Sequence, residues 1–317
     1  MKAVRFHRYG GSEVLRYEEA PRPVPGPGQV LVKVAATSFN PVDAGIRGGY
    51  LSDVYEISFP HIPGVDVVGT IAELGDGVQG WKVGDAVIAF LPLDADGAAA
   101  ENTLVPAESL ATAPRSVDLT DAAALPVAAL TAWQALFEIA GLTAGQTILI
   151  NGAAGAVGGY AIQLAKRAGA VVTATAKARD AARLRGLGAD RTIDYIDYSS
   201  SPVEIEGGPF DVVLNLVSTT DEQTEALIDA TTDGGFHVGT MVFGPQNPGR
   251  GVRSQRVFVR SDAAQLAGLV GRVDEGQLRI EVADRRPLEQ AAAVHEDSDT
   301  GRLRGKTILL ANAGHRV

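Results

Sequence analysis

Residues 146–159 have the sequence Gln-Thr-Ile-Leu-Ile-Asn-Gly-Ala-Ala-Gly-Ala-Val-Gly-Gly, and the rest of the chain is best interpreted from this stretch. Its apolar run at 148–150 predicts a short buried strand, its glycines predict a tight turn, and 156–168 predicts a helix. This order is typical of a dinucleotide-binding unit, because turn amides and a helix N-terminus can approach a pyrophosphate. The glycine spacing departs from G-x-G-x-x-G, so a tight turn without a ligand is the alternative.

The composition is that of an ordinary globular protein, and its 317 residues are enough for two domains. The net charge is −10 and no basic stripe occurs, so neither nucleic acid nor a membrane is an expected partner. We find no apolar run long enough for a membrane span. Residues 1–6 alternate as a strand does and lack a signal-peptide core, so we expect a cytoplasmic location.

The first 120 residues contain short strand patterns separated by turn signals, which predict a β-rich domain. The expected strands are 2–6, 29–36, 60–74, 83–90 and 100–106. Between them, Asn40-Pro41 predicts a turn into a short helix, and Asp43 is expected to accept hydrogen bonds from nearby amides.

From about residue 120, strands and helices alternate, which predicts a parallel sheet with crossover helices. Two alanine-rich helical stretches, 122–125 and 128–139, come first. The expected strands are then 147–151, 171–176, 192–194, 210–217 and 235–239, and the helices are 156–168, 179–186 and 224–230. Two amphipathic helices, 263–275 and 288–296, and two strands, 278–280 and 307–310, complete the chain.

The end of the second strand of this alternating region indicates which nicotinamide cofactor is bound. An acidic residue there accepts from the ribose hydroxyls and favours NAD. This chain has Ala176, Lys177 and Arg179 instead, which favours NADPH with the two cations as phosphate partners. Exposed residues on a surface helix are the alternative, and Asp180 could pair with either base. Tyr195 could cover the adenine, reach the phosphate, or simply pack at the edge of the core.

Metal-ligand residues are few. The chain has no cysteine, which excludes disulfides and Cys-ligated metals, and none of its five histidines pairs with another at ligand spacing. We therefore expect no metal. Without a Lewis acid, delivery of hydride to a conjugated quinone or enone is easier than deprotonation of an alcohol.

The chain resembles the medium-chain dehydrogenase/reductase superfamily, specifically its zinc-independent quinone oxidoreductase (zeta-crystallin-like) branch. Motifs along nearly the whole chain carry this resemblance: 9–15 YGGSEVL, 25–32 PGPGQVLV, 40–43 NPVD, 47–49 RGG, 63–69 PGVDVVG, 83–85 VGD, 153–158 AAGAVG, 163–166 QLAK, 188–190 GAD, 287–291 PLEQA and 305–307 GKT. Zinc-dependent relatives have a Cys near Asn40 and Gly-His-Glu where this chain has Gly-Val-Asp at 64–66. These differences agree with the absence of a metal.

The resemblance implies an α/β protein of two domains. A GroES-like β-rich catalytic domain would comprise 1–121 and 260–317, and a Rossmann doubly wound parallel-sheet domain, 122–259, would bind NADPH. It also implies a homodimer, a small quinone or enone substrate, and cofactor contacts on both domains. The expected cofactor-binding residues are Asn40, Thr131, Ala154, Gly155, Ala156, Val157, Ala176, Lys177, Arg179, Tyr195, Val217, Gly239, Thr240, Met241, Phe258 and Val259.

The chain departs from the family pattern in two places. The family usually has Asp, two residues and Gly after the fourth strand, whereas residues 215–218 are Asn-Leu-Val-Ser. Residues 240–245, Thr-Met-Val-Phe-Gly-Pro, are also unusual and could shape a distinct pocket.

For catalysis, Tyr50 is our first candidate proton donor and Tyr55 the second, and packing in a pocket wall is the alternative for Tyr50. Asn40 could polarise a carbonyl or only hold its turn. Asp43, Asp66 and His61 are expected to be structural. The first function that we predict is an NADPH-dependent quinone oxidoreductase. The alternatives are an NADPH-dependent 2-alkenal or enone reductase and a non-catalytic NADPH-binding protein.

Overall fold

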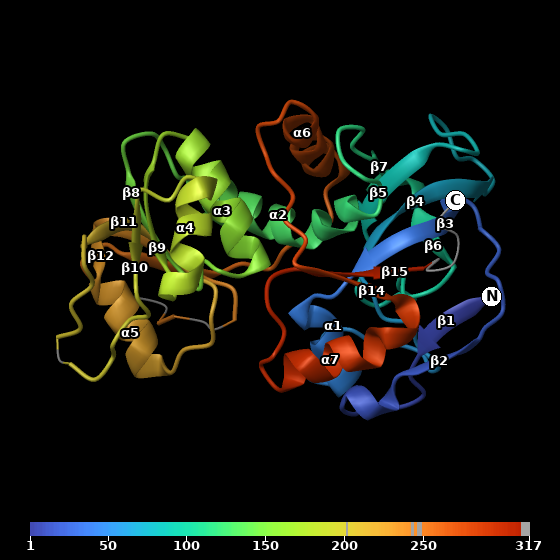
Figure 1. Ribbon diagram of the computed structural model, residues 1–317, viewed down its shortest axis with the longest axis horizontal. Helices are drawn as coiled ribbons and strands as arrows, with labels where there is room; N and C mark the ends of the chain where they lie inside the picture. The colour runs from blue at the N-terminus through green and yellow to red at the C-terminus, as the bar shows by residue number, and fades with distance from the viewer. Residues whose placement is uncertain (201, 242–243, 246–248, 312–317) are drawn as a thin grey trace. The chain divides into compact units, whose positions relative to one another are not determined.

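The computed structural model describes residues 1–200, 202–241, 244–245 and 249–311. The chain divides into two compact units (Figure 1). Unit 1 comprises Met1–Val127 and Ser261–Val317, and unit 2 comprises Ala128–Arg260. The fold class predicted from the sequence is confirmed, because unit 1 contains a mixed β-sheet and unit 2 a wholly parallel one.

Unit 1 is built on a seven-stranded sheet in the order β14-β15-β3-β4-β5-β7, with β6 also paired to β3. A separate antiparallel pair is formed by β1 and β2. The strands are β1 (Lys2–Arg5), β2 (Arg16–Glu19), β3 (Gln29–Ser38), β4 (Asp66–Leu74), β5 (Ala86–Phe90), β6 (Asn102–Pro106), β7 (Ala111–Thr112), β14 (Asp284–Pro287) and β15 (Thr307–Leu310). The helices are α1 (Pro41–Gly48), α6 (Ala263–Asp274) and α7 (Ala291–Asp299), with short 3-10 turns η1 (Ser12–Val14), η2 (Ala107–Ser109), η3 (Asp121–Ala124) and η5 (Leu288–Gln290).

The pairing of β15 with β3 joins the two ends of the chain within unit 1. The strands are antiparallel, and Ile308 lies opposite Ser38. Because both strands continue into loops at this edge, the residue before β15, Lys306, is brought to the residues that follow β3. This register positions the polar cluster described below.

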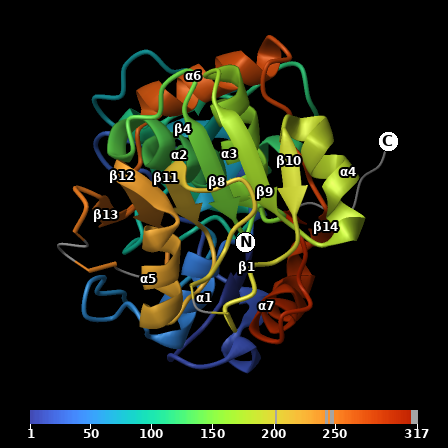
Figure 2. The same ribbon diagram turned by 90° about the vertical axis from the view of Figure 1, so that its left-hand side faces the viewer.

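Unit 2 contains a six-stranded parallel sheet in the order β10-β9-β8-β11-β12-β13, which Figure 2 shows with β8 in its middle. Its strands are β8 (Thr147–Asn151), β9 (Val171–Thr175), β10 (Arg191–Ile193), β11 (Phe210–Asn215), β12 (Thr231–Gly239) and β13 (Arg253–Arg256). Its helices are α2 (Pro126–Trp133), which continues as the π-helix η4 (Gln134–Ile139), α3 (Ala156–Arg167), α4 (Ala178–Leu187) and α5 (Asp221–Asp229). Ile148, Leu149 and Ile150 are completely buried, as expected for a strand covered on both faces.

One predicted strand of unit 1 is wrong, and the strands predicted at 60–74, 83–90 and 100–106 begin later than expected. Leu278-Arg279-Ile280 is not a strand, because the Leu278 amide donates to the Arg272 carbonyl and helps to close α6 instead. Residues 60–65 precede β4 rather than belong to it. The strand near that end of the chain is the polar β14, whose Arg285 pairs with Asp121 at 2.6 Å. A search for apolar alternation does not find such a strand.

One helical stretch contradicts the expectation that no segment could span a membrane. By length and composition, Asp121–Ile139 qualifies, with 19 residues and a mean hydropathy of 1.4. However, 78% of this stretch is buried inside the structure, as in the core helix of a soluble protein. Length and hydropathy alone are weak evidence for a membrane span, and the burial favours a core helix.

Candidate functional site

The glycine turn that follows β8 can only be built from glycine at two positions. Gly152 has a φ of +84°, and a Cβ on it would lie 2.6 Å from Cγ1 of Val217. A Cβ on Gly158 would overlap the carbonyl of Ala153, so this glycine allows α3 to start tight against the turn. The glycines therefore serve close packing of strand, turn and helix, as the dinucleotide-binding pattern requires.

At Gly155, just before α3, the same turn is exposed and not packed against other residues. Gly155 is exposed, and a Cβ on it would meet only the Gly152 carbonyl oxygen, at 3.6 Å. The first bond of α3 runs from the Gly159 amide to the Gly155 carbonyl at 3.0 Å, so the amides of Ala156 and Val157 precede the helical ladder. A helix N-terminus with an open glycine in front of it is suited to a pyrophosphate, and these residues therefore fit a dinucleotide.

A hydrogen-bonded network of buried polar side chains holds the glycine turn at the carboxyl ends of the strands. The sequence analysis did not predict this network. Asn151 donates from Nδ2 to Oδ1 of Asn215 at 3.0 Å and accepts at Oδ1 from Thr175 Oγ1, also at 3.0 Å. The Thr175 hydroxyl in turn accepts from the Gly152 amide at 2.9 Å. These side chains tie together the carboxyl ends of β8, β9 and β11. Asn215, where the family usually has Asp, is therefore part of the support of the turn.

The cations expected at the end of β9 lie in a charged cluster. Lys177 Nζ is 3.1 Å from Oδ1 of Asp194 and 4.4 Å from the ring centre of Tyr195. The Tyr195 amide and the Lys177 ammonium lower the pKa of Asp194. Asp180, which we considered a partner for either base, pairs with Arg179 at 3.4 Å. Lys177 therefore has a carboxylate partner, Asp194, that we did not anticipate.

A third cation in this region, Arg183, was missed. Its Nη2 donates to the carbonyl of Ala154 in the glycine turn at 2.9 Å and lies 3.8 Å from Oδ1 of Asp180. The only sequence signal is the i, i+3 spacing of Asp180 and Arg183 on α4, which places both on one helix face.

Except for Thr131, the remaining expected cofactor residues of unit 2 follow the ends of β11, β12 and β13. The Thr240 amide donates to Asn215 O at 3.0 Å, and the Val257 amide donates to Gly239 O at 2.9 Å. The side chains of Val217, Met241 and Phe258 are exposed, Val259 is half-buried, and Thr131 is buried in α2. Val242 and Phe243, from the unusual segment at 240–245, lie outside the described residues.

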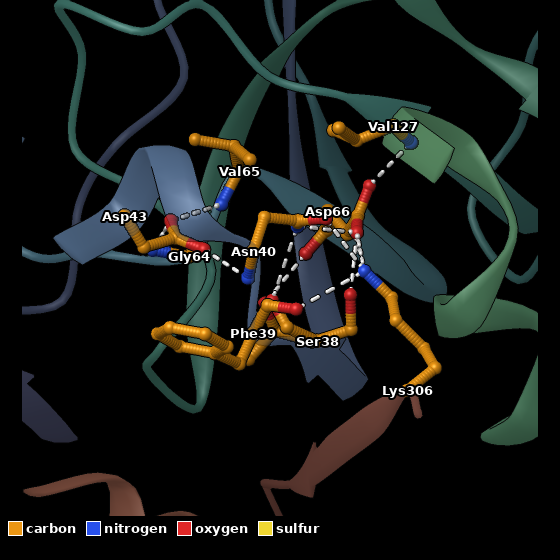
Figure 3. A network of polar contacts seen from close by, with 10 residues as sticks. Ser38, Phe39, Asn40, Asp43, Gly64, Val65, Asp66, Val127 and Lys306 are labelled. Atoms are coloured by element: carbon orange, nitrogen blue, oxygen red, sulfur yellow. Dashed lines mark hydrogen bonds and ion pairs between the residues drawn. The ribbon is translucent and has the colours of Figure 1, made fainter. Parts of the chain in front are cut away.

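In unit 1, Asn40 lies in a buried polar cluster with Ser38, Asp66 and Lys306 (Figure 3). Its Nδ2 donates to Oδ2 of Asp66 at 2.8 Å, and its Oδ1 accepts from Lys306 Nζ at 2.6 Å. The ammonium also lies 3.2 Å from Asp66 Oδ2 and donates to Phe39 O at 3.1 Å. Ser38 Oγ donates to the same Asp66 oxygen. Both ends of the Asn40 amide are thus occupied by protein groups.

Asp43 holds the turn in which Asn40 lies, as the sequence predicts. Its Oδ2 accepts from the Asn40 amide at 2.8 Å, and its Oδ1 accepts from the amides of Gly64 and Val65 at 3.0 and 3.2 Å. Burial raises the pKa of Asp43 to about 7, and the amide hydrogen bonds partly offset this shift. Asp66 is also structural, since its Oδ1 accepts from the Val127 amide at 2.8 Å.

The tyrosine candidates lie after α1. The Tyr50 side chain is 86% exposed and rests against Gly48, whereas Tyr55 is half-buried. His61 is buried and contacts Phe6 edge-to-face at 5.2 Å. Burial lowers the pKa of His61, which agrees with a structural role. Within the described parts of the chain, no three His, Cys, Asp or Glu side chains are placed to hold a metal ion.

Comparisons with known proteins define the class. A family model described as an alcohol dehydrogenase GroES-like domain matches residues 26–115, and one described as a zinc-binding dehydrogenase matches 187–309. A chloroplast envelope quinone oxidoreductase homolog of Arabidopsis thaliana is 33% identical over 98% of both chains. A mitochondrial NAD(P)H oxidoreductase of Danio rerio is 31% identical, over 98% of this chain and 91% of its own.

Solved structures agree with these relatives. The quinone oxidoreductase of Coxiella burnetii has a TM-score of 0.86 and 31% identity, over 98% of this chain and 99% of its own. A mycobacterial protein solved with NADPH has a TM-score of 0.84 and 28% identity, over 98% and 99%. The chain therefore belongs to the medium-chain dehydrogenase/reductase superfamily, and within it to the quinone oxidoreductase family. It is an oxidoreductase that uses a nicotinamide cofactor.

The cytoplasmic location expected from the first residues is contradicted by the relatives. Their names place one in the chloroplast envelope and another in mitochondria. The expectation rested on the lack of a secretory core at residues 1–6, and that feature does not distinguish the cytoplasm from an organelle.

Proposed function

We propose that the protein transfers hydride from NADPH to a quinone without a metal ion. In this proposal, unit 2 binds the nucleotide and unit 1 is the catalytic domain. The observation that carries the NADPH preference is the charged cluster after the end of β9, where Lys177 and Arg179 stand in place of an acidic residue. An acid there would repel a 2′-phosphate, whereas cations attract it.

The residues of unit 2 have distinct tasks in holding the cofactor. The amides of Ala156 and Val157, with Gly155, would receive the pyrophosphate, and Ala154 forms the wall of the turn. Lys177 and Arg179 would pair with the 2′-phosphate, and Tyr195 would lie beside the adenosine. When bound, the nicotinamide supplies the hydride. The residues of unit 2 proposed to lie near the nicotinamide and its ribose are Thr131, Val217, Gly239, Thr240, Met241, Phe258 and Val259. From unit 1, Asn40 is proposed for the same part of the cofactor.

The polar cluster of unit 1 supports chemistry without a metal. Asp66 stands where zinc-dependent relatives have an acid after their histidine, and its carboxylate is already paired with the Lys306 ammonium at 3.2 Å. Because Lys306 and Asp66 occupy both ends of the Asn40 amide, we propose that Asn40 acts by position and packing rather than by polarising a carbonyl. Water or the exposed Tyr50 hydroxyl would supply the proton that accompanies hydride transfer.

The acceptor is tested by a panel of quinones and 2-alkenals, with oxidation of NADPH followed at 340 nm. We expect turnover with quinones, because two of the relatives that cover nearly the whole chain are named for quinones. Turnover confined to 2-alkenals would identify the enone reductase instead. Thermal stabilisation by NADPH with no turnover of any acceptor would identify the non-catalytic binding protein.

We also propose that the protein is a homodimer. The strand β13 is at the edge of the sheet of unit 2, and an edge strand presents unpaired amides and carbonyls to a second chain. Light scattering after size exclusion should give twice the 33.0 kDa mass of one chain. A mass equal to one chain would refute this proposal.

A further inference from the structure

Asn151 is the only asparagine in the sequence that is followed by glycine. Such a pair is chemically labile, because glycine has no side chain to hinder attack of its amide nitrogen on the asparagine side chain. The fold nevertheless uses both residues. Gly152 has a φ of +84°, and a Cβ on it would lie 2.6 Å from Cγ1 of Val217. The buried Asn151 amide joins β8 to β11 through its hydrogen bond to Asn215, at 3.0 Å.

Deamidation at an asparagine followed by glycine proceeds through a five-membered succinimide ring. The Gly152 nitrogen would attack Cγ of Asn151, and ammonia would leave with the proton that this nitrogen gives up. Water then opens the ring at one of its two carbonyls, so the product is aspartate or isoaspartate at position 151. The reaction consumes one water, releases one ammonia and oxidises nothing. It requires the nitrogen to approach Cγ to within about 3–3.5 Å.

The hydroxyl of Thr175 holds both reacting groups. It accepts from the Gly152 amide at 2.9 Å and donates to Oδ1 of Asn151 at 3.0 Å. The attacking nitrogen is therefore engaged through its proton, and the amide that would be attacked is turned toward β9. The strand acts in the same direction. Asn151 is the last residue of β8, and a ψ of about +115° in a parallel strand rotates the following nitrogen away from Cβ.

Conversion of Asn151 would damage the support of the glycine turn. A carboxylate has no N–H to donate and would face Oδ1 of Asn215, whose own Nδ2 already donates to Thr219 Oγ1 at 3.0 Å. Two buried acceptors that face each other are unfavourable. The new negative charge would also lie beside the turn proposed to receive a pyrophosphate, and like charges repel. An isoaspartate would in addition lengthen the backbone between β8 and the turn.

We propose that Asn151 and Gly152 form a latent deamidation site, which the Thr175 hydroxyl keeps unreactive and whose conversion disables cofactor binding. The reactivity is inherent in the dipeptide, and the protection comes from the contact between β8 and β9. The effect on binding rests on the proposed role of the glycine turn in holding the pyrophosphate. Local opening of the Thr175 hydrogen bonds then sets the rate at which the protein loses its cofactor site.

The test compares wild type with Thr175→Val, which removes the hydroxyl and keeps the branched shape. Both proteins are incubated at mildly alkaline pH, and peptide mass spectrometry follows the exchange of the Asn151 amide for an acid. Without the two hydrogen bonds, local opening and therefore deamidation should be at least about tenfold faster in the variant. In urea, both chains should react at one faster rate. Equal rates in the two folded proteins, or a folded wild type that reacts as fast as in urea, would overturn the inference.

Two further variants of β9 are controls. Thr173→Val makes the same change at another buried threonine of the strand and should deamidate as wild type does. A rise equal to that of Thr175→Val would assign the effect to loosening of β9 and overturn the inference. Thr175→Ser retains a hydroxyl and should also react as wild type does. If Thr175→Val does not fold, Thr175→Cys takes its place, since a thiol is a weak donor and acceptor, and a wild-type rate there would overturn the inference.

Binding measurements test the consequence of conversion. Asn151→Asp imitates the aspartate product and should bind NADPH and NADH at least about tenfold more weakly than wild type. Wild-type affinity in this variant would overturn the claim that conversion disables the site. If wild type itself binds neither cofactor, the proposed function fails, whereas the deamidation rates still decide the role of Thr175.

Discussion

At the scale of single residues, Lys177 combines two contacts that can be separated by experiment: an ion pair with Asp194 and a cation–π contact with Tyr195. Both contacts involve groups at the proposed 2′-phosphate site. The ammonium is therefore already positioned before a phosphate arrives, which lowers the cost of ordering it on binding.

Reversing this charge should weaken NADPH selectively. In Lys177→Glu, the new carboxylate would face both Asp194 and the 2′-phosphate, so NADPH affinity should fall at least about tenfold while NADH affinity changes little. Fluorescence titration of both cofactors measures this. Lys82→Glu, an exposed lysine in unit 1, gives the same change in net charge and should behave as wild type. An unchanged NADPH affinity in Lys177→Glu would refute the phosphate site.

Lys306 is the residue on which the cluster of unit 1 depends. In Lys306→Met, Asp66 would be left as a buried carboxylate without its cation, and we expect a loss of about 3–5 kcal/mol in the free energy of unfolding. Urea unfolding followed by circular dichroism measures it. The double variant Lys306→Met/Asp66→Asn removes both charges and should recover part of the loss. If the single variant is as stable as wild type, the pair does not carry the stability assigned to it.

At the scale of elements, the junction of β8, the glycine turn and α3 depends on close contact. Gly158→Ala would force a Cβ against the Ala153 carbonyl, so the helix must shift. We expect a lower melting temperature and weaker binding of NADPH and NADH alike, because the turn serves the part that both share. Gly186→Ala on α4 is the matched control, since nothing lies within 4 Å of its Cβ. Helix propensity should stabilise this control by about 0.5–1 kcal/mol.

An element could be predicted from the sequence when burial or close packing left a local pattern of apolar residues or glycines. It could not be predicted when contacts with distant residues formed it. The strand and helix of 146–168 were found because burial on both faces and close packing of glycine leave a local signature. The strand β14 was missed because it carries two arginines that pair with Asp121, Asp284 and Asp297. Leu278 and its neighbours looked like a strand, but their backbone completes the end of α6.

At the scale of the whole molecule, buried titratable groups make stability depend on pH. Burial lowers the pKa of His237 to about 4, and burial with the nearby Arg47 lowers that of His295 to about 3, from an ordinary value of 6.5. Below pH 6.5 the unfolded chain binds protons at these two histidines and the folded chain does not. The free energy of unfolding therefore decreases as the pH is lowered from 6.5. Asp43, whose pKa is raised, acts in the opposite direction over a similar range.

Comparing a variant with wild type isolates one of these groups. In His237→Phe, the loss of unfolding free energy that His237 causes between pH 6.5 and 4 should disappear; this loss is at most about 3.5 kcal/mol, at about 1.4 kcal/mol per pKa unit. Its unfolding free energy should therefore fall less steeply on acidification than that of wild type. Urea unfolding at several pH values measures both slopes. Equal slopes would mean that the pKa of His237 is not lowered in the folded protein.

The sequence by itself determined the two architectures, the glycine turn and the cations at the end of β9, because burial, glycine requirement and charge are recorded locally. Only the tertiary structure decided which of these residues meet. Lys306 reaches Asn40 across 266 positions through the register of β15 against β3, and Arg183 reaches Ala154 because α4 packs beside the turn. Contacts of this kind depend on the pairing of distant segments, and no local pattern of residues records that pairing.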